Sequence, residues 1–131
     1  MTRKDFLELF REERHSFQRT LGRRSVSCAL IDQICPSVKP CTYRDIGFCT
    51  ISRNPKIVFV ERILSLPENN IIALVRHELG HAFDPLINED GAEQRADDLA
   101  ELVSGKKIRY DRYDLQTIGR GVYPRPLHLH R

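Results

Sequence analysis

Two histidines and a glutamate stand close together in the stretch His77-Glu78-Leu79-Gly80-His81. On an α-helix, residues four apart leave the same face about 40° apart, so the imidazoles of His77 and His81 can bind one zinc ion. Glu78 is rotated about 100° from His77 around the helix axis, and it can reach a water molecule beside the metal without being a ligand. This H-E-x-x-H spacing predicts a catalytic zinc site in which Glu78 is the general base.

A catalytic zinc ion usually has three protein ligands and one open position. Downstream, Glu93 and Asp97 are four residues apart and therefore share one face of a helix. We predict that Glu93 completes the coordination and that Asp97 accepts the second ring N–H of a ligating histidine. Alternatively, Glu93 is the third residue of a D-x-x-E capping box that begins at Asp90, and Asp97 faces solvent like its neighbour Asp98. Three other acidic residues are the alternative third ligands: Asp84, Glu89 and Asp90.

An H-E-x-x-H motif followed by E-x-x-x-D resembles the signature of gluzincin metallopeptidases, which belong to the zincin superfamily. The short chain is similar to the single-domain minigluzincins, and its H-E-L-G-H motif also resembles that of small repressor-cleaving peptidases of phages and mobile elements. The resemblance covers mainly residues 46–104. It implies a zincin-like fold, zinc as the cofactor and a peptide or protein as the substrate. It also implies the following roles: zinc ligands at His77, His81 and Glu93, a general base at Glu78, and a carboxylate partner of a ligand at Asp97.

The expected reaction is hydrolysis of a peptide bond. Zinc lowers the pKa of its bound water towards 7 and polarises the scissile carbonyl. Glu78 takes the proton of this water and later returns it to the leaving amine. A further group must stabilise the oxyanion. The C-terminal tail contains the candidates, among which no spacing selects: Tyr110, Tyr113, Tyr123, His128 and the tail arginines.

A non-catalytic or latent module, stabilised by a metal and binding a protein or nucleic-acid partner, is the alternative function. Glu78 favours the enzyme, because it lies in an otherwise apolar stretch of helix and a purely structural site has no use for it.

Regular patterns predict the elements that position these residues. A helical repeat of apolar residues predicts an amphipathic N-terminal helix: Phe6, Phe10, Phe17 and Leu21. Gly22 is its expected end. Residues 26–34 are apolar, and we interpret them as a short helix. The runs 46–52 and 56–63 are rich in β-branched and aromatic residues and are separated by a proline-containing turn, which predicts a β-hairpin.

Capping signals delimit the two helices of the metal site. The segment from Ser65 to Glu68 has the pattern of a capping box, with proline in the first turn. Asp84-Pro85 ends this helix, because the residue before a proline avoids the α region. The second helix runs from about Ala92 to Ser104, and Gly105 follows its last turn.

The length of 131 residues supports one domain with a modest core. Eleven residues separate His81 from Glu93, so a tight turn must join the two metal helices. We therefore expect a single α+β, zincin-like domain over residues 1–131, with an N-terminal helix, a small sheet that includes the hairpin, the H-E-x-x-H helix and the Glu93-bearing helix. The metal core spans about residues 46–104, and residues 106–131 form a basic tail.

The net charge of +3 is unevenly distributed. Residues 84–105 contain one basic and seven acidic residues, whereas residues 106–131 contain seven basic and two acidic residues. We interpret the acidic segment as the second half of the metal site. The basic tail is a solvated end, a segment packed across the acidic cleft, or an arm that contacts nucleic acid; we do not favour the last.

The cysteines form no C-x-x-C pair, although all four lie within 22 residues: Cys28, Cys35, Cys41 and Cys49. Free thiols are the expected state. A second, structural zinc ion bound by these four residues and a set of disulfides are the alternatives. No run approaches the roughly 18 apolar residues of a membrane span, and the N-terminus does not have the pattern of a signal peptide. We expect a cytoplasmic protein without membrane contact, and we predict neither its oligomeric state nor its cleavage specificity.

Overall fold

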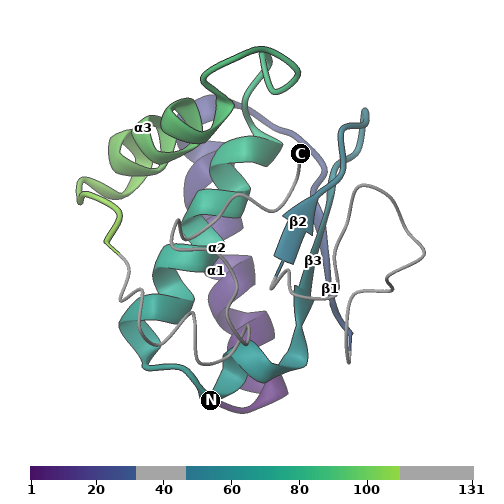
Figure 1. Ribbon diagram of the computed structural model, residues 1–131, viewed down its shortest axis with the longest axis vertical. Helices are drawn as coiled ribbons and strands as arrows, with labels where there is room; N and C mark the ends of the chain where they lie inside the picture. Colours follow the sequence, from purple (N-terminus) through teal and green to yellow (C-terminus); the bar gives the residue numbers. More distant parts are fainter. Residues whose placement is uncertain (32–46, 110–131) are drawn as a thin grey trace.

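The computed structural model describes residues 1–31 and 47–109 of the chain. This part contains three α-helices, one 3-10 helix and three strands (Figure 1). In chain order they are α1 (Arg3–Leu21), β1 (Ser27–Ile31), β2 (Gly47–Cys49), β3 (Lys56–Val60), the 3-10 helix η1 (Glu61–Ser65), α2 (Glu68–Ala82) and α3 (Ala92–Ser104). The predicted α+β class is therefore confirmed.

The three strands form a small mixed sheet in the order β1-β3-β2. Strand β2 is antiparallel to β3, with Phe48 opposite Val58, so the predicted β-hairpin is present. Strand β1 is parallel to β3, with Ala29 opposite Val58. The central strand is buried from Ile57 to Val60, which explains its continuous run of apolar residues.

The predicted short helix over residues 26–34 is wrong, because Ser27–Ile31 is strand β1. A short apolar run does not by itself distinguish a strand from a buried helix. Here the backbone of the run finds hydrogen-bonding partners along β3, which lies far away in the sequence. Pairing with that strand decides the conformation.

Helix α1 has the predicted apolar face. Phe6, Phe10 and Phe17 are buried, and the ring of Phe6 packs edge-on against Phe59 of β3 at 5.5 Å between centroids. The helix begins after Thr2, whose hydroxyl accepts a hydrogen bond from the Asp5 amide. It ends at Gly22, whose φ of 107° suits glycine. The sequence therefore predicted both the buried face and the end of this helix correctly.

Helix α2 carries the H-E-x-x-H motif and is enclosed by the rest of the protein. It contacts α1, α3 and strands β2 and β3 (Figure 1). Its residues from His77 to Ala82 are all buried, as a helix with neighbours on several sides requires. Arg76, directly before this run, is only partly buried. Its guanidinium forms a bidentate ion pair with Glu13 of α1, at 2.8 and 3.1 Å.

The predicted capping box at Ser65 is wrong. Ser65 is the last residue of the 3-10 helix η1, and its hydroxyl donates to the Arg62 carbonyl instead of capping α2. Helix α2 begins at Glu68 after Pro67, without a side-chain cap. The second predicted strand (56–63) is also shorter than expected, because the chain turns into η1 after Val60.

No helix within residues 1–31 and 47–109 is both long and apolar enough to cross a membrane. Several residues of interest lie outside the described residues, together with most of the basic tail: Cys35, Cys41, Tyr110, Tyr113, Tyr123 and His128.

Candidate metal centre

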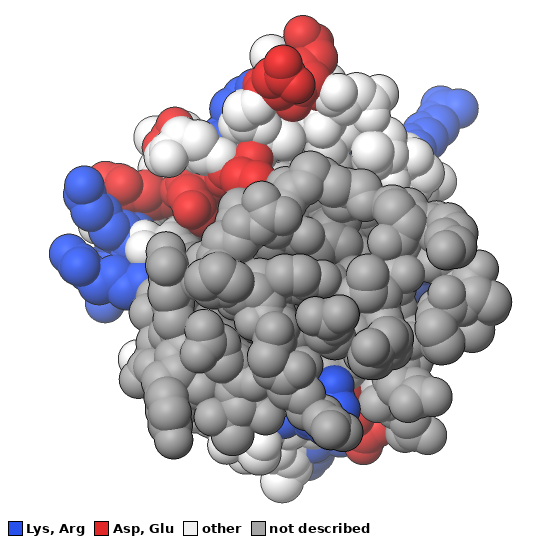
Figure 2. Space-filling view, in the orientation of Figure 1, with Lys and Arg blue, Asp and Glu red and all other residues white. Residues whose placement is uncertain are grey.

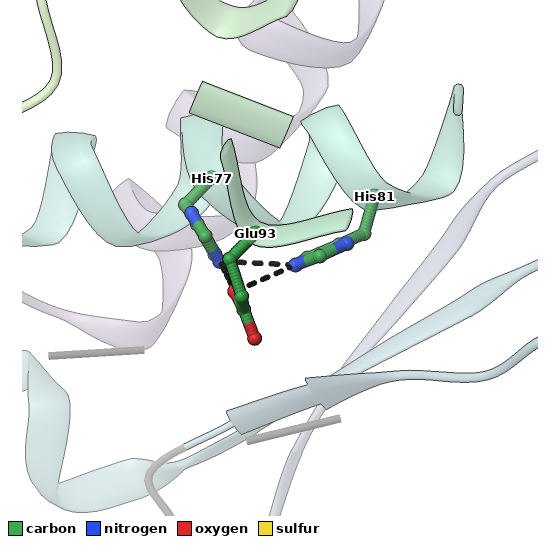
Figure 3. A group of neighbouring side chains, drawn as sticks. All are labelled: His77, His81 and Glu93. Carbon is green, nitrogen blue, oxygen red and sulfur yellow. Dashed lines mark hydrogen bonds and ion pairs between the residues drawn. The ribbon is translucent and has the colours of Figure 1, made fainter. Parts of the chain in front are cut away.

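Helices α2 and α3 bring three potential metal ligands together. The imidazoles of His77 and His81 point from α2 towards the carboxylate of Glu93, which reaches them from α3 (Figure 3). Both histidines are buried, and Glu93 is partly buried. The three ligand atoms form a nearly equilateral triangle: the two Nε2 atoms are 3.1 Å apart, and Glu93 Oε1 lies 3.0 Å from His77 Nε2 and 3.2 Å from His81 Nε2.

The dimensions of this triangle fit a bound metal ion. Ligand atoms at about 2.0–2.1 Å from a tetrahedral ion are roughly 3.3 Å from one another, close to the spacing found here. The donor set of two imidazoles and one carboxylate is also one that a transition metal prefers. His77, His81 and Glu93 can therefore hold a metal ion.

The tautomer of His77 strengthens this interpretation. Its Nδ1 lies 2.7 Å from Oδ1 of Asp97, so Nδ1–H donates to that carboxylate. In the neutral ring the Nε2 atom is then an acceptor, and it faces a carboxylate oxygen of Glu93. Two acceptors at 3.0 Å need a cation between them, either a proton or a metal ion.

The structure shows which of the candidate acidic residues contact the histidines. Asp97 contacts His77, whereas Asp98 is exposed and accepts a hydrogen bond from Gln94. Glu93 contacts both histidines, and Gly91 rather than Asp90 is the N-cap of α3, so the capping-box alternative does not apply. The alternative ligands do not belong to the metal-binding group: Asp84, Glu89 and Asp90.

Asp97 and its neighbour Asp98 form a matched pair for mutation. We expect Asp97→Ala to weaken metal binding by about 10- to 100-fold, because the partner of a ligating histidine orients the ring and raises its basicity. Asp98→Ala should leave the affinity unchanged, since Asp98 contacts neither histidine. Titration of both variants with Zn²⁺ against a competing chelator measures the difference. Equal affinities of the two variants would contradict the assignment.

The same contacts change the protonation of His77. Burial of the ring lowers its pKa, but the hydrogen bonds to Asp97 and Glu93 and the charges of Glu78 and Asp97 outweigh this effect and raise the pKa to about 9. The metal-free ring therefore holds a proton at neutral pH, in the place where a metal ion would bind.

Metal binding should consequently depend on pH in a defined direction. Because a metal ion must displace the His77 proton, we expect the affinity to fall by up to about tenfold for each pH unit below 9. At pH 7, binding should release about one proton per metal ion. Calorimetric titrations in buffers of different ionisation enthalpy measure this number. An affinity that stays constant between pH 6 and pH 8 would rule out a protonated His77.

Arg95 organises the connection between the two metal helices. Its guanidinium forms an ion pair with Asp84 at 2.9 Å and donates to the backbone carbonyls of Leu86, Glu89 and Asp90. One side chain thus ties the segment from Asp84 to Asp90 to the first turns of α3, where Glu93 lies. The sequence interpretation overlooked Arg95, although it is the single basic residue among residues 84–105.

Gly80 allows α3 to approach α2. A Cβ atom at this position would lie 2.8 Å from both Cα and the carbonyl carbon of Ala96, and closer still to its carbonyl oxygen. Real Cβ atoms essentially never come closer than 3.0 Å to a heavy atom of another part of the chain. Since the obstructing atoms are backbone, they cannot rotate away. The glycine inside the H-E-L-G-H motif therefore sets the helix spacing at which Glu93 reaches the histidines.

The two described cysteines are free thiols on either side of the central strand. Cys28 and Cys49 are both opposite Ile57, so two strand spacings, about 9.5 Å, separate them, which is too far for a disulfide. Burial raises the pKa of Cys28 to about 12. Burial also raises the pKa of Cys49 well above its usual range, the charge of Glu78 raises it further, and the charge of Arg24 lowers it.

Acidic side chains gather on the surface near this centre. Figure 2 shows them over α3 and over the connection between α2 and α3. The exposed ones in this part of the chain are Glu89, Asp90, Asp98 and Glu101. The predicted acidic segment thus divides into a few residues that face the metal centre and several that face solvent.

Comparisons with known proteins found no matching family model, no similar curated protein and no similar solved structure. The function is therefore inferred from the geometry of the site.

Proposed function

We propose that this protein is a zinc-dependent peptidase of the gluzincin type, with a zincin-like arrangement of α2, α3 and the sheet. His77, His81 and Glu93 would hold the zinc ion, and Glu78 would be the general base. Two nitrogens and one oxygen are the ligand set of many catalytic zinc sites, in which the fourth position stays open for water and substrate. The resemblance of both motifs to gluzincins supports the same choice of metal and reaction.

The observation that carries the proposal is the burial of Glu78. Its carboxyl group is fully buried beside His77, yet it is not one of the three grouped ligands. Burying an ionisable carboxyl group is costly, and a site that only stabilises the fold would gain nothing from an acidic group that is not a ligand. A hydrolase needs such a group to move protons.

In the proposed hydrolysis, the bound zinc ion and the residues of the site would have distinct roles. A bound zinc ion would supply Lewis-acid chemistry, polarising the scissile carbonyl and lowering the pKa of water. Glu78 would accept a proton from the attacking water, so that the remaining hydroxide adds to the carbonyl carbon. As the C–N bond breaks, Glu78 would return that proton to the leaving amine nitrogen. Asp97 would keep the ring of His77 in the orientation that presents Nε2.

The test combines metal analysis with a cleavage assay on the full-length chain. The purified protein is stripped of metal, reloaded with Zn²⁺ and incubated with unfolded casein. We expect one zinc ion per chain and cleavage that chelation abolishes and zinc restores. The His77→Ala variant should lose both zinc binding and cleavage. The His15→Ala variant should keep its zinc, because His15 is exposed on α1.

The outcomes separate the candidate functions. Zinc binding without cleavage of any protein or peptide would favour the non-catalytic metal-stabilised module. A chain that binds no divalent metal would contradict both functions. More than one zinc ion per chain would support the alternative of a second, structural zinc site at the cysteines.

A further inference from the structure

A cavity of about 350 Å³ lies directly beside the metal centre. His81 forms part of its wall, and three segments that are distant in sequence form the rest: residue 24 before β1, the β2–β3 turn, and the chain that follows α2. The β2–β3 turn and the chain that follows α2 both lie at the upper end of the molecule in Figure 1. The cavity is large enough for an amino-acid side chain.

Arg24 supplies the charge of this cavity. Its Nη2 donates to the Ser52 carbonyl at 3.2 Å, while its Nε is buried without a hydrogen-bond partner. Within the described part of the chain Arg24 has no ion pair with a carboxylate. A partly buried guanidinium that uses one of its five N–H donors is well suited to bind an anion.

The one acidic side chain in the cavity wall is already neutralised. Asp84 accepts the Leu86 amide at 2.8 Å and the Arg95 Nε at 2.9 Å, so both of its oxygens are occupied. The hydroxyl groups of Thr50 and Ser52, which also line the cavity, lie 3.1 Å apart and add polar partners. The cavity therefore combines one uncompensated positive charge with hydroxyl groups.

A basic groove adjoins the cavity through the same arginine. Arg24 also lines a hollow of about 740 Å³ together with Arg19 and Arg23. Residues 14–26 contain four arginines and no acidic residue. The field of these charges extends the preference for a negative group beyond the cavity itself.

From these observations we propose that the cavity is a subsite for an acidic side chain of the peptide substrate, bound by the guanidinium of Arg24. The proposal rests on the peptidase function and specifies its substrate class: peptides with aspartate or glutamate near the scissile bond. Arg24 would be the residue that determines specificity. The position of the cavity against His81 would place the acidic side chain within a few residues of the bond that is cut.

A peptide fits this region better than a nucleic acid. The cavity itself contains one cation, and the adjoining groove adds only Arg19 and Arg23, whereas a phosphate backbone needs a continuous track of cations. The chain that follows α2 also carries the exposed carboxylates of Glu89 and Asp90, which would repel a polyanion. An isolated carboxylate can enter without meeting them.

Binding measurements test the subsite independently of catalysis. The probes are fluorescein-labelled, C-terminally amidated decapeptides of alanine and serine, with a single glutamate at each position in turn, and matched peptides with glutamine. They are titrated with full-length, zinc-loaded Glu78→Gln protein, which leaves the peptide uncut. We expect the best glutamate peptide to bind at least about tenfold more tightly than its glutamine counterpart, because the charged hydrogen bond is lost in the latter.

Variants at Arg24 assign the preference to this residue. Arg24→Gln should abolish the difference between the two peptides, and Arg24→Glu should reverse it in favour of a lysine peptide. The matched control is Arg53→Gln, because Arg53 is exposed in the adjacent β2–β3 turn but lines neither the cavity nor the groove. Thermal unfolding of each variant shows whether it folds, and the reversal by Arg24→Glu distinguishes lost specificity from a damaged fold.

Each result bears on either the subsite or the peptidase function. The subsite would be overturned if the glutamate and glutamine peptides bound equally or undetectably. It would also be overturned if the preference for glutamate persisted in Arg24→Gln. In either case, cleavage by the wild-type protein would still uphold the peptidase function. An Arg24-dependent preference without any cleavage by the wild-type protein would uphold the subsite and overturn the peptidase. A requirement for a free C-terminal carboxylate, tested with unamidated peptides, would overturn the assignment to a side chain. Tighter Arg24-dependent binding of a ten-nucleotide single strand would overturn it in favour of a phosphate polymer.

Discussion

Replacing Glu78 with glutamine is expected to lower kcat/KM for peptide cleavage by roughly 10²- to 10⁴-fold, the usual contribution of a general acid–base group. The substitution keeps the size and shape of the side chain but removes its ability to take a proton. His77, His81 and Glu93 remain, so the variant should still bind one zinc ion per chain. Cleavage assays and metal analysis on the same preparation measure the two properties together.

Glu68→Gln is the matched control for this prediction. Glu68 is an exposed carboxylate at the first turn of the same helix, so its replacement removes an identical charge without touching the site. The control should cleave at the wild-type rate. A Glu78→Gln protein that binds zinc and cleaves at full rate would exclude Glu78 as the base.

Gly80→Ala is expected to disturb both the fold and the metal centre. Alanine is the better helix former by about 1 kcal/mol, so the substitution should stabilise an isolated helix. In this protein the new methyl group would overlap the backbone of Ala96, and forcing extra atoms into a packed contact costs about 1–3 kcal/mol or more. We expect a net loss in the free energy of unfolding, measured by denaturant titration.

The same substitution should weaken metal binding by at least about tenfold, because moving α3 away from α2 displaces Glu93 from the two histidines. Asn69→Ala is the control, since Asn69 is exposed on the same helix and its replacement should change stability by less than about 0.5 kcal/mol. Wild-type stability and wild-type affinity in Gly80→Ala would show that the two helices do not need this close contact.

Much of the candidate site could be predicted because its spacing is local. The four-residue separation places His77 and His81 on one face of any α-helix, and it does the same for Glu93 and Asp97. The phenylalanine repeat of α1 and the glycines that follow α1 and α3 also act within a few residues of one another. Such signals need no knowledge of the rest of the chain.

Other features depended on partners that are remote in sequence. Residues 27–31 form a strand because they pair with β3. The apolar run by itself does not show that such a partner strand is present. Ser65 has a capping pattern, yet its hydroxyl donates to the Arg62 carbonyl within η1 instead of capping α2. Local patterns fail at such points because a competing contact offers the same groups a better partner.

The sequence by itself determined which helices carry the histidines, the acidic residues and the buried aromatic face. Only the tertiary structure decided that Glu93, rather than Asp84 or Asp90, meets both imidazoles, and that Gly80 and Arg95 hold its helix in place. It also brought Arg24, from the connection between α1 and β1, to the cavity beside His81. The physical reason is that helical spacing is a property of a few consecutive residues, whereas a site shared by two helices requires packing contacts between distant parts of the chain.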